Sequence, residues 1–240
     1  MLITKQHSNT KISVTGQDIP YMNKKHIFDL WNMATETDKN TNWYKDENAF
    51  VTSLATEYGM SCEKVAYLIS AISPQTKWEK NKFYAKQALV AYDAVTNGWL
   101  ERQSMPKVHK YSAMSNNGYA VLFGENFKLG QKTTSFAKNL LGDMQEVTVD
   151  SLAMSILLGF YRKAGSYKIS NKAYKHAQKL YTEVASVLGV APAHLQAVTW
   201  VTCRKLKKQD KGYNLLYVSG ILGRFATPTA VLQWLAVNDI

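Results

Sequence analysis

Two residues of this 240-residue chain have the types and spacing of a catalytic pair. Lys132 follows Gly130 and Gln131, and Asp150 comes eighteen positions later, directly after Val149. A neutral lysine amine can form a Schiff base with an electrophilic carbon, and a carboxylate stabilises positive charge that develops nearby. The pair therefore predicts nucleophilic catalysis through a cationic transition state. Two alternatives remain open: Asp150 only caps a helix, and Lys132 only binds phosphate or faces solvent.

The sequence around this pair predicts two helices joined by a short connector. An apolar stripe at helical spacing begins after Gly130, and Gly142 is typical of a helix end because glycine readily adopts left-handed angles. Residues 147–149 form an extended run that leads to Asp150, the expected N-cap of the second helix. Lys132 would then lie in the first turn of one helix and Asp150 at the start of the next. A helix N-terminus favours an ionised carboxylate, so capping and catalysis by Asp150 are compatible.

These motifs resemble the centre of the helix-hairpin-helix DNA glycosylases, in particular the endonuclease III branch. In that family a hairpin ending in Gly-x-Lys-Thr carries the Schiff-base lysine, and a Val-Asp pair at the next helix start carries the catalytic aspartate. Residues 130–133 and 149–150 match both motifs and their spacing. Residues 72–76, Ile-Ser-Pro-Gln-Thr, are similar to the family's Leu-Ser-x-Gln-Thr element, whose glutamine enters the DNA stack when a base is flipped. The resemblance implies Lys132 and Asp150 as catalytic residues and Gln75 as the wedge.

The chain also departs from that family. Residues 126–128 replace the Leu-Pro-Gly of the usual hairpin, Leu152 and Ser155 stand where the family has His and Arg, and the four-cysteine iron–sulfur loop is missing. Such losses fit divergent, phage-type members of the superfamily. Besides a base N-glycosylase with or without AP-lyase activity, two alternatives stay open. One is an enzyme of viral DNA base hypermodification, and the other is a catalytically inactive glycosylase-fold effector that binds DNA or protein.

The charge of the chain favours a polyanionic partner. The formal net charge is +11, and between Asp150 and Asp210 ten basic residues stand against one acid, Glu183. Such an imbalance predicts phosphate contacts with double-stranded DNA, which carry no sequence specificity by themselves. The expected DNA contacts, taken from the motifs and the basic segments, are Gln75, Lys77, Lys80, Gly130, Lys168, Lys172, Lys205 and Lys207.

Other classes of site and location are disfavoured by the sequence. The five histidines show no metal-ligand spacing, and no phosphate-binding or dinucleotide loop is found, so we expect no metal and no cofactor. No apolar run approaches the roughly 18 residues of a membrane span, and the N-terminus lacks the apolar core of a signal peptide. Cys62 and Cys203 are interpreted as two thiols in a reducing compartment. We therefore expect a monomer in a bacterial or virus-infected host cytoplasm, with no membrane partner.

The remaining patterns predict an all-α fold of the helix-hairpin-helix DNA glycosylase type, with two helical lobes around a cleft. We expect residues 1–20 to form an N-terminal arm and residues 21–240 a single helical domain with two interleaved lobes. Pro74 should end a helix and place Gln75 on a tight bend. Ser61, Asn42 and Asn171 are the expected caps. The expected helices span about 24–35, 42–58, 61–73, 77–95, 110–123 (interrupted at 116–118), 131–141, 150–160, 171–188 and 192–204, with a linker at 165–170 and a last helix from 227.

Overall fold

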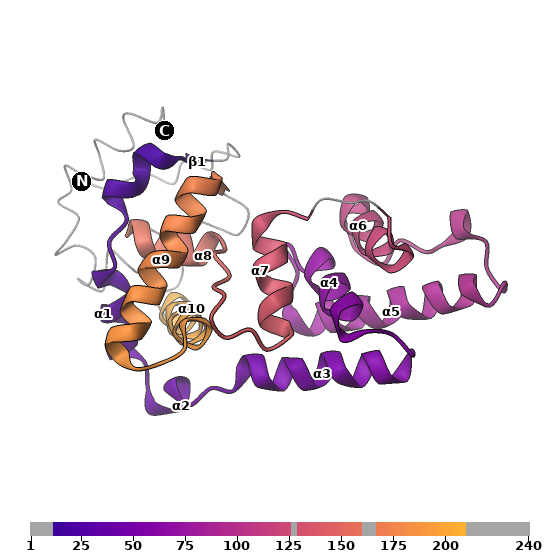
Figure 1. Ribbon diagram of the computed structural model, residues 1–240, viewed down its shortest axis with the longest axis horizontal. Coiled ribbons are helices and arrows are strands. Elements are labelled where there is room, and N and C mark those ends of the chain that lie inside the picture. Colours follow the sequence, from indigo (N-terminus) through magenta and orange to yellow (C-terminus); the bar gives the residue numbers. More distant parts are fainter. Residues whose placement is uncertain (1–11, 126–128, 160–166, 210–240) are drawn as a thin grey trace. The chain divides into compact units, whose positions relative to one another are not determined.

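A computed structural model describes residues 12–125, 129–159 and 167–209, and these are mostly helical, which confirms the predicted class at that level (Figure 1). The chain divides into two compact units. The first contains residues 1–41 and 149–240, and the second is the intervening segment, residues 42–148. The helix predicted from residue 227 and most of the predicted N-terminal arm lie outside the described residues.

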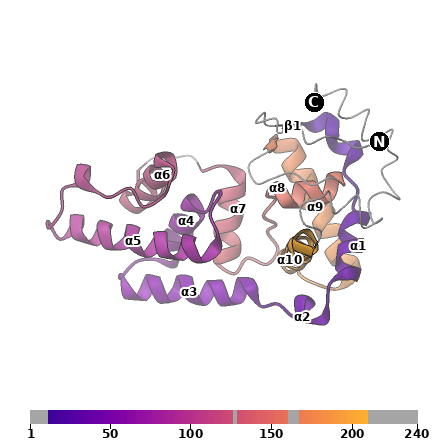
Figure 2. The same cartoon turned by 180° about the vertical axis from the view of Figure 1, so that it is seen from behind.

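The second unit is built around α4 (Cys62–Ile72). Its residues Val65, Leu68 and Ile69 are fully buried, because other helices pack against it on every side. A helix that is apolar all round belongs in a core rather than on a surface. The surrounding helices, seen from both sides in Figures 1 and 2, are α3 (Trp43–Glu57), α5 (Trp78–Thr96), α6 (Ser112–Phe123) and α7 (Gln131–Leu140). A short 3-10 helix, η2 (Arg102–Ser104), lies between α5 and α6 in the chain.

Helix α6 is continuous, so the predicted interruption at residues 116–118 is wrong. Gly118 is buried, and a Cβ atom at this position would lie 2.7 Å from Ile72 Cγ2 and 3.1 Å from Leu68 Cδ1 of α4. The missing side chain therefore allows the backbones of α4 and α6 to approach closely. Packing against α4 outweighs the poor helix propensity of Asn-Asn-Gly, which is a local term of about 1 kcal/mol per glycine.

In the first unit, α10 (Pro192–Gln209) has the most neighbours among the described helices. It packs against α1 (Lys25–Met33), α2 (Glu36–Lys39), α8 (Ser151–Leu158) and α9 (Asn171–Leu188). A 3-10 helix, η1 (Gly16–Tyr21), contacts α9. Pro192 is the first residue of α10, as predicted, because a proline at this position gives up an N–H group that would have no partner in the helix.

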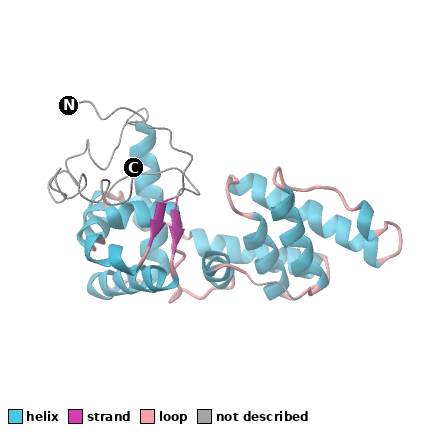
Figure 3. Ribbon diagram, turned by 90° about the horizontal axis from the view of Figure 1, so that it is seen from above, coloured by secondary structure: helices cyan, strands magenta, loops and turns pink. Residues whose placement is uncertain are grey.

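Two short strands add a small sheet to this unit. β1 (Ile12–Val14) pairs in parallel with β2 (Tyr167–Ile169), and Figure 3 shows the pair in magenta. The prediction of a linker at 165–170 is therefore wrong for the three residues of β2. Strands separated by about 150 positions leave no local alternation long enough to reveal their pairing.

Of the caps predicted at Ser61, Asn42 and Asn171, the structure confirms the first and corrects the other two. The hydroxyl of Ser61 accepts the Lys64 N–H at the start of α4, as predicted. At the start of α9, however, Ser170 is the cap and Asn171 is already helical. Asn42 occupies the N-cap position of α3 but makes no side-chain capping bond, because its backbone is not in the extended conformation that a capping side chain needs.

Replacing Gly118 by alanine tests the close approach of α4 and α6. We expect Gly118→Ala to lower the free energy of unfolding by about 1 kcal/mol, because overpacking of about 1–3 kcal/mol exceeds the gain in helix propensity of about 1 kcal/mol. Asn116→Ala, an exposed change two residues earlier, should instead raise it by a few tenths of a kcal/mol. Urea denaturation measures both, and equal stabilisation by the two changes would contradict the packing argument.

Candidate functional site

Gln75 lies on the turn between α4 and α5 and has φ of 58°, the one positive value among the described residues other than glycine. A left-handed backbone is unfavourable for a residue with a Cβ atom, so the surrounding structure must hold it. The Thr76 N–H donates to the Ser73 carbonyl at 3.2 Å, which closes the turn. The exposed Gln75 side chain is oriented by Tyr111, whose hydroxyl donates to its Oε1 at 3.1 Å. The predicted bend and its outward glutamine are therefore observed.

His109 supports the same turn from within the core. Its Nδ1 accepts the Tyr111 N–H at 3.0 Å, so the neutral ring carries its proton on Nε2, 2.6 Å from the Thr76 hydroxyl oxygen. Its own backbone N–H donates to Ser115 Oγ at 2.9 Å. Burial lowers the pKa of His109, and the nearby positive charges of Lys110 and Lys107 act in the same direction. Sequence reasoning missed this histidine, because nothing local connects it to residue 76.

The start of α7 is bonded to the helix that leads into the Gln75 turn. Ser70, fully buried near the end of α4, donates its hydroxyl to the Thr133 carbonyl at 2.6 Å. Ser73 in turn donates its hydroxyl to the Ser70 carbonyl at 2.9 Å. Two successive hydrogen bonds thus lead from the residue after Lys132 to the turn that presents Gln75. The structure brings these two predicted sites into one junction of the second unit.

Gly130 is the N-cap residue of α7 and Lys132 is the second residue of that helix. Glycine has no side chain to accept the first N–H groups of the helix, and the position is exposed. Uncapped N–H groups and the helix dipole favour an anion at such an end. Lys132 is partly exposed and forms no ion pair within the described residues. Both residues are thus positioned to meet a phosphate.

The lysines of α5 differ in their availability. Lys77, the N-cap residue, and Lys80, in the first turn, are exposed and have no acidic partner within the described part of the chain. Lys82, by contrast, pairs with the buried carboxylate of Glu47 at 2.9 Å. The predicted contacts Lys77 and Lys80 are therefore free to bind phosphate, whereas Lys82 is already neutralised.

Asp150 belongs to the first unit and caps α8, as predicted. Its Oδ1 accepts the N–H groups of Leu152 at 2.9 Å and Ala153 at 2.8 Å. Its Oδ2 accepts the indole N–H of Trp200, from α10, at 3.1 Å. The guanidinium carbon of Arg204 lies 4.5 Å from the centre of the Trp200 ring. Three donors therefore fix the carboxylate, and Trp200 is a contact that the sequence pattern alone did not distinguish from a core tryptophan.

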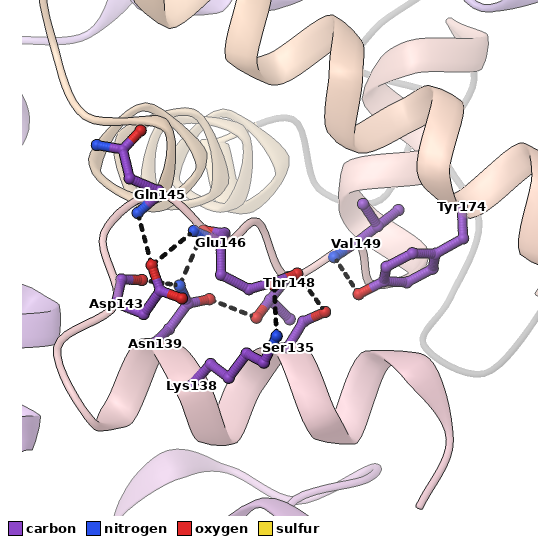
Figure 4. A network of polar contacts seen from close by, with 9 residues as sticks. All are labelled: Ser135, Lys138, Asn139, Asp143, Gln145, Glu146, Thr148, Val149 and Tyr174. Atoms are coloured by element: carbon purple, nitrogen blue, oxygen red, sulfur yellow. Dashed lines mark hydrogen bonds and ion pairs between the residues drawn. The ribbon is translucent and has the colours of Figure 1, made fainter.

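The connector that precedes Asp150 is held by a buried asparagine of α7 (Figure 4). Asn139 is fully buried, and its amide group donates to the carbonyls of Asp143 at 2.8 Å and Glu146 at 2.9 Å. Its oxygen accepts the Thr148 hydroxyl at 2.6 Å. The Glu146 carboxylate accepts the Ser135 hydroxyl at 2.8 Å. These bonds fix the chain as far as Thr148, so the predicted extended run is held by side chains rather than by a neighbouring strand.

Lys132 and Asp150 lie in different compact units. Within the first unit, the Val149 N–H donates to the buried Tyr174 hydroxyl at 3.1 Å, which anchors the residue just before Asp150 (Figure 4). The pairing of Lys132 with Asp150 in one active site, and the cleft that would contain both, stay predictions.

The predicted basic contacts of the first unit also differ from one another. Lys168 is exposed on β2 and Lys172 is exposed in the first turn of α9, with its aliphatic stem packed over Gly16. Lys205 instead forms an ion pair with Asp38, which is only 5% exposed. The side chain of Lys207 lies outside the described residues.

The Asp38–Lys205 pair neutralises one of the predicted phosphate contacts. Burial raises the pKa of the Asp38 carboxyl, but bonds from Lys205 and from Thr35 outweigh it, and the pKa falls below its ordinary value. A lysine that holds a buried carboxylate in this way is a weaker partner for DNA than its charge suggests.

No group of three or more His, Cys, Asp and Glu side chains among the described residues is arranged to hold a metal ion. Cys203 is buried and Cys62 is partly buried, and neither forms a disulfide bond with another described residue. No single helix of the described segments is long and apolar enough to cross a membrane; only α9 and most of α10 taken together, across a 98° bend, reach that length and composition.

Residues 10–207 match a protein family described as a family of unknown function, DUF7178. The chain belongs to this family. No curated protein and no solved structure matches the chain. The part of the chain that matches DUF7178 includes the Gln75 turn, the start of α7 and the Asp150 cap. Function must therefore be argued from these groups themselves.

The burial of His109, which lowers its pKa, makes the stability of this protein depend on pH. Because its pKa in the folded state lies below the ordinary 6.5, its contribution is complete above about pH 6.5 and is lost as the pH falls toward the folded-state pKa. We expect the free energy of unfolding to decrease between about pH 7 and pH 5. His109→Gln keeps groups that can bond Thr76 and Tyr111 but does not titrate, so it should reduce this slope.

His26 provides a second, independent contribution to the same pH dependence. It is buried in the first unit, donates from Nδ1 to the Ile156 carbonyl at 3.0 Å, and its pKa is also lowered by burial. His26→Gln should therefore remove a second part of the slope, and the double variant should be nearly flat. An unchanged slope in His109→Gln would show that His109 does not titrate in the way proposed.

Proposed function

We propose that this protein is a DNA-binding base N-glycosylase that acts on a flipped base and has the helix-hairpin-helix glycosylase fold. The observation that carries the proposal is the junction in the second unit, where the Gln75 turn is hydrogen-bonded to the start of α7. Gln75 is held at the surface in an unfavourable conformation, which is typical of residues retained for function. Lys132 follows within the same junction, at a helix end suited to an anion.

Binding would begin with phosphate contacts in the second unit. The open N–H groups after Gly130 are suited to one DNA phosphate, and the exposed ammonium groups of Lys77 and Lys80 to others. Gln75, already oriented by Tyr111, would enter the gap that a flipped base leaves in the stack. Because the Gln75 side chain is already ordered in the folded protein, it loses less conformational entropy when DNA binds.

The proposed chemistry uses Asp150 and Lys132 in sequence. The bond between C1′ and the base nitrogen breaks, the base leaves with the electron pair, and the Asp150 carboxylate stabilises the cationic sugar. Lys132 Nζ, in its neutral form, then bonds to C1′; the C1′–O4′ bond breaks and one proton passes from the nitrogen to O4′, which leaves a protonated Schiff base on the opened sugar. Loss of a proton from C2′ breaks the 3′ C–O bond, which is the AP-lyase step. Trp200, through its bond to Oδ2, keeps the carboxylate in a single orientation.

A second candidate is a catalytically inactive effector with the same fold. It is favoured by the Asp150 geometry, because both carboxylate oxygens already accept protein donors. A carboxylate that already accepts three hydrogen bonds, two as a helix cap and one from an indole, has less capacity to interact with a sugar. The two candidates differ in whether incubation with DNA changes the DNA, and nucleotide mass spectrometry of the products also distinguishes base release from hypermodification.

Borohydride trapping tests the role of Lys132. With an abasic-site duplex, the wild-type protein should give a covalent complex, and Lys132→Ala should abolish it. Lys132→Arg is the matched control, because arginine retains the positive charge but cannot form the Schiff base. If Lys132 is the nucleophile, Lys132→Arg binds duplex normally but is not trapped. Trapping that persists in Lys132→Arg would contradict this role and leave phosphate binding as the function of Lys132.

Asp150→Asn separates catalysis from capping. Asparagine caps helices about as well as aspartate, but its NH₂ group would face the Trp200 N–H, so we expect a loss of about 1 kcal/mol in unfolding free energy. Trp200→Phe removes the same indole bond and should cost a similar amount. Base release should be abolished by Asp150→Asn but only slowed in Trp200→Phe, which keeps the carboxylate and loses one of the bonds that orient it. Base release that survives in Asp150→Asn would favour the inactive-cap interpretation and a different catalytic group.

Salt dependence of duplex binding tests the basic residues of the first unit. Each phosphate contact contributes about −0.9 to the slope of log K against log salt. Lys168→Gln and Lys172→Gln should each reduce that slope by about 1, whereas Lys205→Gln should change it less because Asp38 already neutralises Lys205. Duplex affinity that does not depend on salt would rule out the phosphate contacts.

A further inference from the structure

A row of four rings runs through the second unit from α5 to the loop before α6. The rings are Phe83, Tyr84, His109 and Tyr111, and successive ring centres are 6.2, 5.3 and 5.5 Å apart. Tyr84 and His109, in the middle, are buried. The two ends are not: 55% of Phe83 and 42% of Tyr111 is exposed. The row therefore presents two aromatic residues to solvent, both anchored to the core through buried rings.

Lysines accompany this row of rings. Lys110 Nζ lies 4.7 Å from the centre of the exposed Tyr111 ring, and Lys80 Nζ lies 5.5 Å from that of the buried Tyr84, the neighbour of Phe83 in the chain. Lys86 is exposed one helical turn after Phe83, on the same face of α5. None of the three has an acidic partner in the segments that the structure describes. The acid of this face, Glu79, lies 3.9 Å from Lys82 instead.

We propose that the two exposed ends of this row, Phe83 with Lys80 and Lys86 and Tyr111 with Lys110, together called the stacking surface, bind unpaired DNA by stacking one base on each exposed ring. Rings that accept any base and cations that follow a backbone are the two components of single-strand binding sites. A protein partner fits less well, because three lysines without acidic partners among the described residues accompany the rings, and lysine is depleted in protein–protein interfaces. The charges are complementary to phosphate.

The Tyr111 end of the stacking surface adjoins the Gln75 turn directly. Tyr111 contributes both an exposed ring and the hydroxyl that orients Gln75 at 3.1 Å. Nucleotides that lose their stacking partners when a duplex is opened at Gln75 would therefore find Tyr111 beside them. The choice of DNA as the nucleic acid rests on the proposed function, but the stacking surface itself does not require catalysis.

Fluorescence anisotropy with a labelled oligodeoxythymidylate of about 12 nucleotides, within the usual range of single-strand sites, tests the proposal. We expect Tyr111→Ala and Phe83→Ala each to weaken binding by about fivefold or more, the effect of losing one stacked base. Tyr111→Phe keeps the ring and loses only the hydroxyl, so its affinity should remain within about twofold of wild type. Trp99→Ala is the matched control, because Trp99 is 78% exposed in the same unit but has no contact with the row of rings.

The outcomes separate this proposal from the glycosylase proposal. Wild-type protein that does not bind the oligonucleotide, or an equal loss in Trp99→Ala, overturns the stacking surface whatever the catalytic result. If the protein binds the oligonucleotide with the expected order of variants, but releases no base and forms no covalent complex with DNA, the stacking surface is supported and the glycosylase proposal is overturned. Far-ultraviolet circular dichroism melting of each variant shows whether a loss of affinity comes from unfolding; a folded Tyr111→Ala that binds like wild type also overturns the proposal.

Discussion

The buried end of α4 is the constraint on which the second unit depends. A helix that ends inside a core leaves carbonyl and hydroxyl groups that water cannot reach, and each must find a protein partner. The buried amide of Asn81, from α5, donates to the Ile69 carbonyl at 3.1 Å, and the Ser70 hydroxyl donates to Thr133 of α7 at 2.6 Å. These bonds connect α5 and α7 to the end of α4. The Gln75 turn, which joins α4 to α5, therefore lies between two helices that are bonded to each other and hold its unfavourable backbone conformation.

Asp150 illustrates how one side chain can be suited both to structure and to chemistry. Its three hydrogen bonds stabilise α8 and connect that helix to Trp200 of α10 within the first unit. The same bonds orient the carboxylate and reduce the reorganisation that a developing cation would require. They also use most of its capacity as an acceptor, which is why geometry alone favours neither the enzyme nor the effector completely. The glycosylase and the effector differ in whether Asp150 stabilises a cationic sugar, a role that capping a helix does not require.

The net charge of the chain is distributed less simply than its composition suggests. Lys82 and Lys205 both neutralise buried carboxylates, whereas Lys80, Lys86 and Lys110 have no acidic partners among the described residues. A lysine beside a buried acid stabilises the fold, because leaving that acid unpaired would be costly. A lysine beside an exposed ring has no such role in the core. Lys168 and Lys172 of the first unit are exposed as well, so the available positive charge is found in both units.

The local features of this protein were determined by the sequence itself. Helix starts and ends at Ser61, Pro74, Gly142, Asp150 and Pro192 follow from hydrogen bonds and backbone angles within a few residues, and the pattern predicted each of them. The same holds for the outward position of Gln75 and for the placement of Lys132 in a first helical turn.

Only the tertiary structure decided the features that join distant segments. The Trp200 bond to Asp150, the support of Thr76 by His109, and the pairing of β1 with β2 connect residues far apart in the chain. Gly118 remains helical only because α4 lies against it. In each case the decisive energy comes from packing or from a hydrogen bond to a group that folding brings close. The residue types within one stretch of sequence do not predict which distant group will become the partner.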